Sequence, residues 1–66
     1  MRIMVHHRHG EDIVGEGDDE GEVLEELEKY CRYWWDEVSD EEPPEGKDEV
    51  IAEYFAKRED EWWEFR

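Results

Sequence analysis

Two segments of the chain concentrate carboxylates and almost exclude bases. Residues 11–22 hold seven acids and no lysine or arginine, and residues 36–49 hold eight acids with Lys47 as the only base. Together they carry 15 of the 23 acids in the chain. A dense array of carboxylates attracts basic surfaces and metal cations, and it repels the phosphates of nucleic acid. The chemistry that these segments favour is therefore recognition of positive charge.

The acids of both segments are the predicted contacts to a partner: Glu11, Asp12, Glu16, Asp18, Asp19, Glu20, Asp36, Glu37, Asp40, Glu41, Glu42, Glu45, Asp48 and Glu49. Some of them have a local reason to be acidic, because negative charge at a helix N-terminus gains about 0.3–1 kcal/mol from the helix dipole. That reason covers the start of a helix near residue 19. It does not cover residues 36–41, at or beyond its end, where acid is disfavoured. Departures from local rules tend to occur at functional sites.

Other groups that could do chemistry are few. His7 and His9 share a face of a predicted strand, but a structural zinc site needs four ligands and the only cysteine, Cys31, is remote in sequence. We therefore predict no metal and no cofactor. The 23 carboxylates single out no catalytic acid or base, so we expect a protein that is not an enzyme. Cys31 lies on the apolar side of a predicted helix and is expected in the core.

Length and charge limit the range of functions. The 66 residues make one small domain with a net charge of −15, and the four tryptophans argue against disorder. Nucleic acid and anionic membranes are poor direct partners for this charge. There is no apolar run near the ~18 residues of a membrane span and no apolar signal-peptide segment, so a cytoplasmic location is expected.

The hydrophobic pattern predicts an α+β fold. Residues 2–17, with a turn near Gly10, are expected to form a β-hairpin, and residues 19–38 a central amphipathic helix with a capping aspartate at its start. Residues 39–47 are an acidic connector that contains Pro43 and Pro44. Residues 48–66 fit a second helix, with a C-terminal β-hairpin as the alternative.

Aromatic residues near the acids are candidate anchors of an interface, because tryptophan and tyrosine are frequent binding hot spots. We predict Trp35 and Trp63 as exposed anchors. Trp34 falls on the apolar stripe of the central helix with Val23, Leu27, Tyr30, Cys31 and Val38, so it is expected in the core, as is Trp62.

Residues 15–30, GEGDDEGEVLEELEKY, resemble the strand-to-helix junction of HicB-like antitoxin domains. In those domains a turn rich in glycine and acid leads into a helix with an E-x-x-L-x-x-L-E pattern. The resemblance implies a β-hairpin followed by a helix. It assigns no functional residue.

In its general charge the chain resembles the small acidic phage proteins that inhibit host defences: anti-restriction proteins, DNA-glycosylase inhibitors and DNA-mimic anti-CRISPR proteins. The resemblance implies an inhibitor that mimics DNA charge and occupies the nucleic-acid-binding groove of a basic host protein, as a monomer or small homo-oligomer. An anti-CRISPR or anti-restriction protein in the host cytoplasm is the most specific form. One alternative is an antitoxin or other regulatory partner of a basic protein. Another is a halophilic domain without a specific acidic site, whose acids should be spread over the surface.

Overall fold

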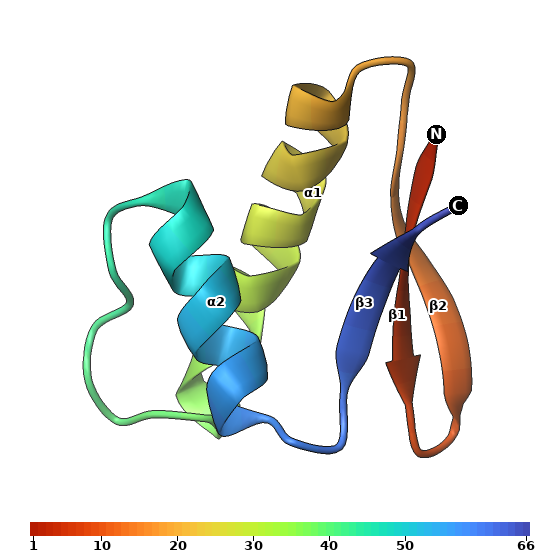
Figure 1. Cartoon of the computed structure of the whole chain (residues 1–66). Coiled ribbons are helices and arrows are strands. Elements are labelled where there is room, and N and C mark those ends of the chain that lie inside the picture. The colour runs from red at the N-terminus through yellow and green to blue at the C-terminus, as the bar shows by residue number, and fades with distance from the viewer.

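A three-stranded antiparallel sheet is covered on one face by two helices in the computed structural model, which describes residues 1–66 (Figure 1). The chain runs through β1 (Arg2–His7), β2 (Gly10–Glu16), α1 (Glu20–Tyr33), a short 3₁₀ turn η1 (Trp35–Glu37), α2 (Lys47–Lys57) and β3 (Trp62–Phe65). The strand order is β2-β1-β3. The predicted α+β fold, with an N-terminal hairpin, a central helix and a second helix, is confirmed.

The hairpin brings β2 close against α1. Its turn is Arg8–His9, and Gly10 follows with φ of 137°, a conformation that residues with side chains rarely adopt. The register slips by one residue after Ile3, which pairs with Gly15 while Met4 pairs with Ile13. A Cβ atom on Gly15 would lie 2.7 Å from Cβ of Glu26, so only glycine lets the helix approach this closely.

Helix α1 begins at a capped turn and ends five residues earlier than predicted. The Oδ1 atom of Asp19 accepts a 2.7 Å hydrogen bond from the Gly21 N–H. The four-residue spacing of Val23, Leu27 and Cys31 continues to Trp35, and all four are buried. At Trp34 the chain tightens into η1, which turns Trp35 inward and leaves Trp34 exposed.

The C-terminal segment combines the predicted helix, which is shorter than expected, with a strand in the second half of the hairpin alternative. Helix α2 ends at Lys57, and β3 then pairs with β1, so that Ile3 faces Phe65 and Val5 faces Trp63. This pairing makes β1 the central strand and packs Trp63 and Phe65 against the core. Burial of these aromatic groups on the sheet outweighs the helical spacing of the same residues.

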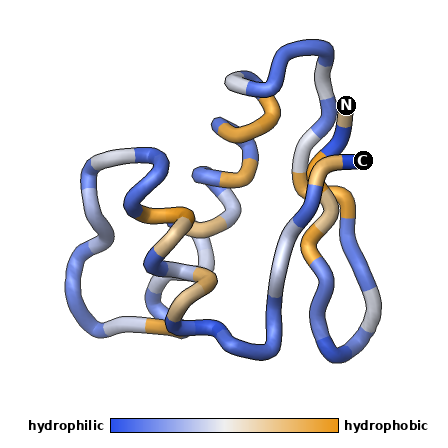
Figure 2. The backbone as a smooth tube through the Cα atoms, viewed as in Figure 1, coloured by the Kyte–Doolittle hydropathy of each residue, from blue (hydrophilic) through white to orange (hydrophobic).

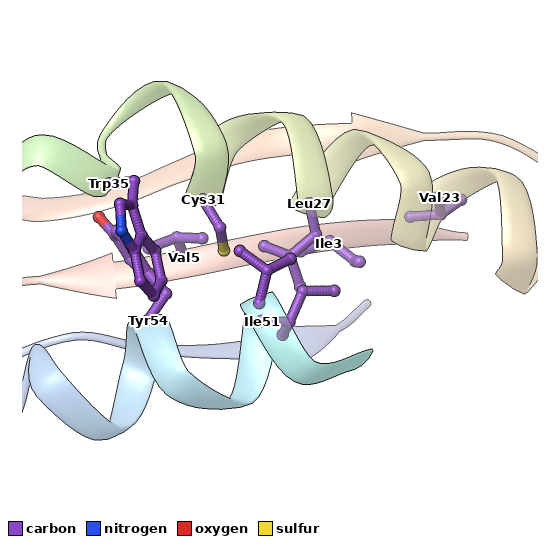
Figure 3. Close-up of a cluster of buried hydrophobic side chains, with 9 residues drawn as sticks. Ile3, Val5, Val23, Leu27, Cys31, Trp35, Ile51 and Tyr54 are labelled. Atoms are coloured by element: carbon purple, nitrogen blue, oxygen red, sulfur yellow. The ribbon is translucent and has the colours of Figure 1, made fainter. Parts of the chain in front are cut away.

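The core lies between the helices and the sheet (Figure 3). It joins Ile3 and Val5 of β1 to the buried stripe of α1 and to Val50, Ile51 and Tyr54 of α2. Cys31 is fully buried, as predicted. Burial, with a smaller effect from Glu61, raises the pKa of the Cys31 thiol to about 12, so this thiol acts as an apolar packing group.

Candidate acidic interface

Acids on the hairpin have basic partners. Glu16 lies 3.6 Å from Arg2, Asp12 lies 2.9 Å from the His7 ring, and Glu11 lies 3.2 Å from His6 and 3.7 Å from Arg66. Antiparallel pairing of the strands creates these contacts, since residues far apart in sequence face each other across the sheet. Each acid of the hairpin part of the predicted interface therefore has a basic neighbour, an arginine for Glu11 and Glu16 and a histidine for Asp12.

Most other acids have no such partner. Of the 23 carboxylates, nine lie within 4 Å of a basic side chain, which leaves fourteen that do not. Glu37, a predicted contact, belongs to the paired group because it lies 3.6 Å from Arg58. The unpaired group contains ten predicted contacts: Asp18, Asp19, Glu20, Asp36, Asp40, Glu41, Glu42, Glu45, Asp48 and Glu49.

The connector between the helices is held against α1 by its backbone, while its carboxylates stay exposed. The Trp35 indole Nε1–H donates to the Glu41 carbonyl at 2.7 Å, and Arg32 Nη2 donates to the Glu45 carbonyl at 2.9 Å. Pro43 and Pro44 between these points restrict the backbone further. The exposed side chains are those of Asp40, Glu41, Glu42 and Glu45, and with Asp36 they form what we call the connector surface.

Figure 1 shows that α1 and α2 run in the same direction, so their N-termini point toward the same end of the molecule. The connector therefore carries the chain from the end of α1 back toward the end where α1 begins. Acids occupy the first turn of each helix: Glu20 and Glu22 in α1, and Asp48 and Glu49 in α2. On a continuous helix from residue 19 to residue 38, the two acidic segments would lie at opposite ends, about 25–30 Å apart. The second segment instead returns toward the first, and Figure 2 shows the turn before α1 and the connector as mostly hydrophilic.

The predicted assignment of the tryptophans is largely reversed. Trp35 is 3% exposed and belongs to the core, and Trp63 is half-buried against it. Trp34 and Trp62, expected in the core, are 39% and 54% exposed. The strict four-residue spacing from Val23 to Trp35 is the sequence signal that places Trp35 inside.

Exposed aromatic rings lie at the end of α1, and one of them, Trp34, also lines the cleft described below. Tyr33 is 76% exposed, and its ring meets Trp34 edge-to-face with centroids 4.9 Å apart. These two residues lie immediately before η1 and Asp36 in the chain. They take the place of Trp35 and Trp63 as candidate aromatic anchors.

An open cleft of about 400 Å³ lies between the hairpin turn, α1, α2 and the loop before β3. At its base Glu61, whose side chain is 8% exposed, accepts from the Tyr30 hydroxyl at 3.1 Å and lies 2.9 Å from Arg58 Nε. Arg58 also donates to the Tyr54 hydroxyl at 3.2 Å. This network joins both helices to the loop that leads into β3.

The protonation states in the cleft suit a structural network. Burial, followed by the nearby Glu61, raises the pKa of Tyr30 to about 12, and burial also raises the pKa of Tyr54. Burial disfavours the charged form of Arg58, but Tyr54 and Glu61 outweigh this and raise its pKa. Both phenols therefore keep their protons at neutral pH, where they can donate hydrogen bonds but cannot act as bases.

The histidines of the hairpin are engaged with their neighbours. The Nδ1 atom of His7 accepts from the His9 N–H at 3.2 Å, which leaves the proton on Nε2 to donate to Asp12 at 2.9 Å. No group of three or more histidine, cysteine, aspartate or glutamate side chains is arranged to hold a metal ion. Neither helix has the length and apolar character needed to cross a membrane.

Comparison with protein-family models, with curated proteins and with solved structures finds no match. The resemblance of residues 15–30 to HicB-like domains stays a prediction. It concerns the junction between β2 and α1, which contains no group beyond the acids and the helix cap already described.

Proposed function

We propose that this protein is a DNA mimic that occupies the cationic nucleic-acid-binding groove of a host protein or complex and so inhibits it. The observation that supports the proposal is the connector surface. Its carboxylates are exposed and have no basic partners, and its backbone is held by hydrogen bonds from Trp35 and Arg32. Its most specific form is a phage inhibitor of a defence system, of the anti-CRISPR or anti-restriction type. The action is binding without catalysis.

The spacing of the acids suits this role. Duplex DNA carries one charge per ~1.7 Å of axis, and a protein that binds it releases counterions for each phosphate neutralised. Carboxylates one turn apart on a helix, or on neighbouring residues of a fixed loop, stand about 5–6 Å from each other. The helix starts and the connector surface thus offer a partner a run of negative charges. A fixed backbone lowers the entropy lost on binding.

The exposed aromatic pair gives the interface its apolar anchor. Charge alone steers a partner and speeds association, but rim charges contribute little to the lifetime of a complex. Tyr33 and Trp34 can supply the buried aromatic contact that dominates many interfaces. Loss of either ring should therefore speed dissociation, whereas added salt should mainly slow association.

The test is a pull-down from the host with the wild-type chain and with two triple variants. D40K/E41K/E42K reverses three charges of the connector surface. E25K/E53K/E59K changes the net charge equally but at unpaired, exposed acids elsewhere. We expect the first variant to lose about 100-fold in affinity for the captured protein and the second to lose far less.

Competition with duplex DNA completes the experiment. A partner held in its nucleic-acid-binding groove should be released by DNA, and the complex should weaken as salt rises. Binding that survives the connector reversal, or that DNA does not displace, would exclude a mimic acting through this surface. A captured basic protein that binds no nucleic acid would instead support the alternative of an antitoxin or other regulatory partner of a basic protein.

A further inference from the structure

The open cleft beside the hairpin turn lies at the end of the molecule where both helices finish. Trp34 and Arg58, which line it, are the C-terminal caps of α1 and α2, and Figure 1 shows the hairpin turn at the same end. Because α1 and α2 run in the same direction, the negative ends of both helix dipoles point to this end. A positive charge is favoured near the last turn of a helix, so this end of the fold favours a cationic ligand.

The side chains of the cleft add to the negative potential. Its carboxylates are those of Asp12, Glu37, Asp60 and Glu61, and its guanidinium groups are those of Arg8 and Arg58. Four acids against two arginines leave two negative charges in excess. The His7 ring does not offset them, because its Nδ1 atom accepts a hydrogen bond and the ring is therefore uncharged.

Two of these carboxylates have oxygens that accept no hydrogen bond. Glu37 lies 3.6 Å from Arg58 and Asp60 lies 3.8 Å from Arg8, and both distances are too long for a hydrogen bond from a guanidinium group. Glu61 differs, because one oxygen accepts from a tyrosine hydroxyl and the other lies 2.9 Å from Arg58 Nε. Glu37 and Asp60 therefore remain able to accept hydrogen bonds from a ligand.

Trp34 supplies an aromatic wall beside these acids. Its ring is 39% exposed and lines the cleft, and an edge-to-face contact with Tyr33 supports it. The face of an indole attracts cations, and a planar guanidinium group can stack on it while its N–H groups point toward carboxylates. An ammonium group lacks this planar fit. The combination of an indole and two free carboxylates suits arginine better than lysine.

We propose that the cleft receives one arginine side chain of the basic partner, stacked on Trp34 and donating hydrogen bonds to Glu37 and Asp60. This inference rests on the proposed function, since nucleic-acid-binding grooves present arginines that contact phosphates. The volume of about 400 Å³ is near the lower limit of the ~300–1,000 Å³ typical of ligand pockets, which suits a single side chain. Glu37 directly follows Asp36 of the connector surface, so one partner can contact both.

The first test uses the full chain and three capped tripeptides, Ac-Gly-Xaa-Gly-NH₂, in which Xaa is arginine, lysine or citrulline. Citrulline has the shape of arginine without its charge, and lysine has the charge without the planar group. NMR titration at constant ionic strength follows the Trp34 indole N–H and the Glu61 amide. We expect a dissociation constant of about 1 mM for the arginine peptide and binding at least about fivefold weaker for the other two.

Two double variants with the same charge change locate the site. E37Q/D60N removes the two free carboxylates of the cleft, whereas E25Q/E53Q removes two exposed carboxylates of the helices. We expect the first to weaken binding of the arginine peptide about tenfold and the second less than about twofold. W34A, followed by the Glu61 amide, replaces E37Q/D60N if circular dichroism shows that the double variant does not fold.

Several outcomes overturn the proposal: no saturable shift up to about 20 mM arginine peptide, equal binding of the three peptides, or equal effects of the two double variants. Shifts caused by inorganic phosphate in place of the arginine peptide also overturn it and make the cleft an anion site. None of these results involves the host partner, so they do not decide the proposed function. In the pull-down, a partner that is lost with D40K/E41K/E42K but retained by E37Q/D60N would support the mimic and overturn the role of the cleft.

Discussion

The segments that form the sheet and the rest of the chain differ in net charge and in how many of their acids have basic neighbours. Residues 1–16 and 62–66 have four acids and three arginines, for a net charge of −1, and all four acids lie within 4 Å of a basic side chain. Residues 17–61 have nineteen acids and five bases, for a net charge of −14. Nearly all of the net charge therefore lies outside the sheet.

The difference follows from how each region fixes its side chains. In the sheet, strand pairing brings basic and acidic side chains from distant positions together, so each acid gains a basic neighbour as a result of folding. In the connector, Trp35 and Arg32 donate hydrogen bonds to backbone carbonyl oxygens. The carboxylates of the connector take no part in these hydrogen bonds. Acids that the fold does not use are the better candidates for recognition.

The largest expected effect comes from removing the anchor of the connector. Trp35→Ala deletes a buried ring and the hydrogen bond to the Glu41 carbonyl, so we expect a loss of about 3–5 kcal/mol in the free energy of unfolding. A domain of this size has little more than that to lose. Trp34→Ala, next in sequence but exposed, should cost less than about 1 kcal/mol. Urea denaturation followed by circular dichroism measures both; equal losses would mean that the connector is not held through Trp35.

The fold was more predictable than the site for a physical reason. The hairpin, the central helix and the second helix follow from local patterns: turn residues, a cap and an apolar period. The partners of Glu11, Asp12 and Glu16 depend on strand register, and Glu11 also depends on the pairing of β3 with β1, which no local pattern predicts. Whether a carboxylate is paired is a tertiary property, so the sequence could locate the acids but not separate the paired from the unpaired.

The exposure of the tryptophans was also hard to predict from the sequence, because neighbouring residues in the chain can point in different directions. Trp34 and Trp35 are neighbours, and either could continue the stripe of Val23, Leu27 and Cys31 on a regular helix. The four-residue step that recurs from Val23 to Cys31 favours Trp35, which η1 turns inward. The predicted second helix included Trp62 and Trp63. In a strand, however, successive side chains point to opposite faces, so Trp63 packs on the core and Trp62 lies on the other face of the sheet.

Salt should stabilise the folded chain, by less than Trp35→Ala destabilises it. The unpaired acids of residues 17–61 repel each other in the folded state, and screening relieves this repulsion. We expect the free energy of unfolding, measured with urea at a concentration low enough to keep the chain monomeric, to rise on the order of 1 kcal/mol between dilute buffer and about 0.5 M NaCl. D40K/E41K/E42K should reduce this dependence. A chain that is unfolded in dilute buffer would favour salt adaptation as the reason for its acidity over a specific acidic surface.

The smallest expected effects are those of removing one acid from the sheet or one from the connector. They test the difference between the two regions most directly, because the two changes in the free energy of unfolding should have opposite signs. Glu16→Gln removes a partner of Arg2 at an exposed site, so it should lower the free energy of unfolding by less than about 1 kcal/mol. Glu42→Gln, an isosteric change at another exposed position, removes a charge that only repels its neighbours. It should therefore raise that free energy by a few tenths of a kcal/mol, about the size of a surface effect. Parallel urea titrations in low salt measure both. Two changes of the same sign would mean that the acids of the sheet and of the connector are not held differently by the fold. Opposite signs that vanish in about 1 M NaCl, where surface charges are screened within ~3 Å, would identify the difference as electrostatic.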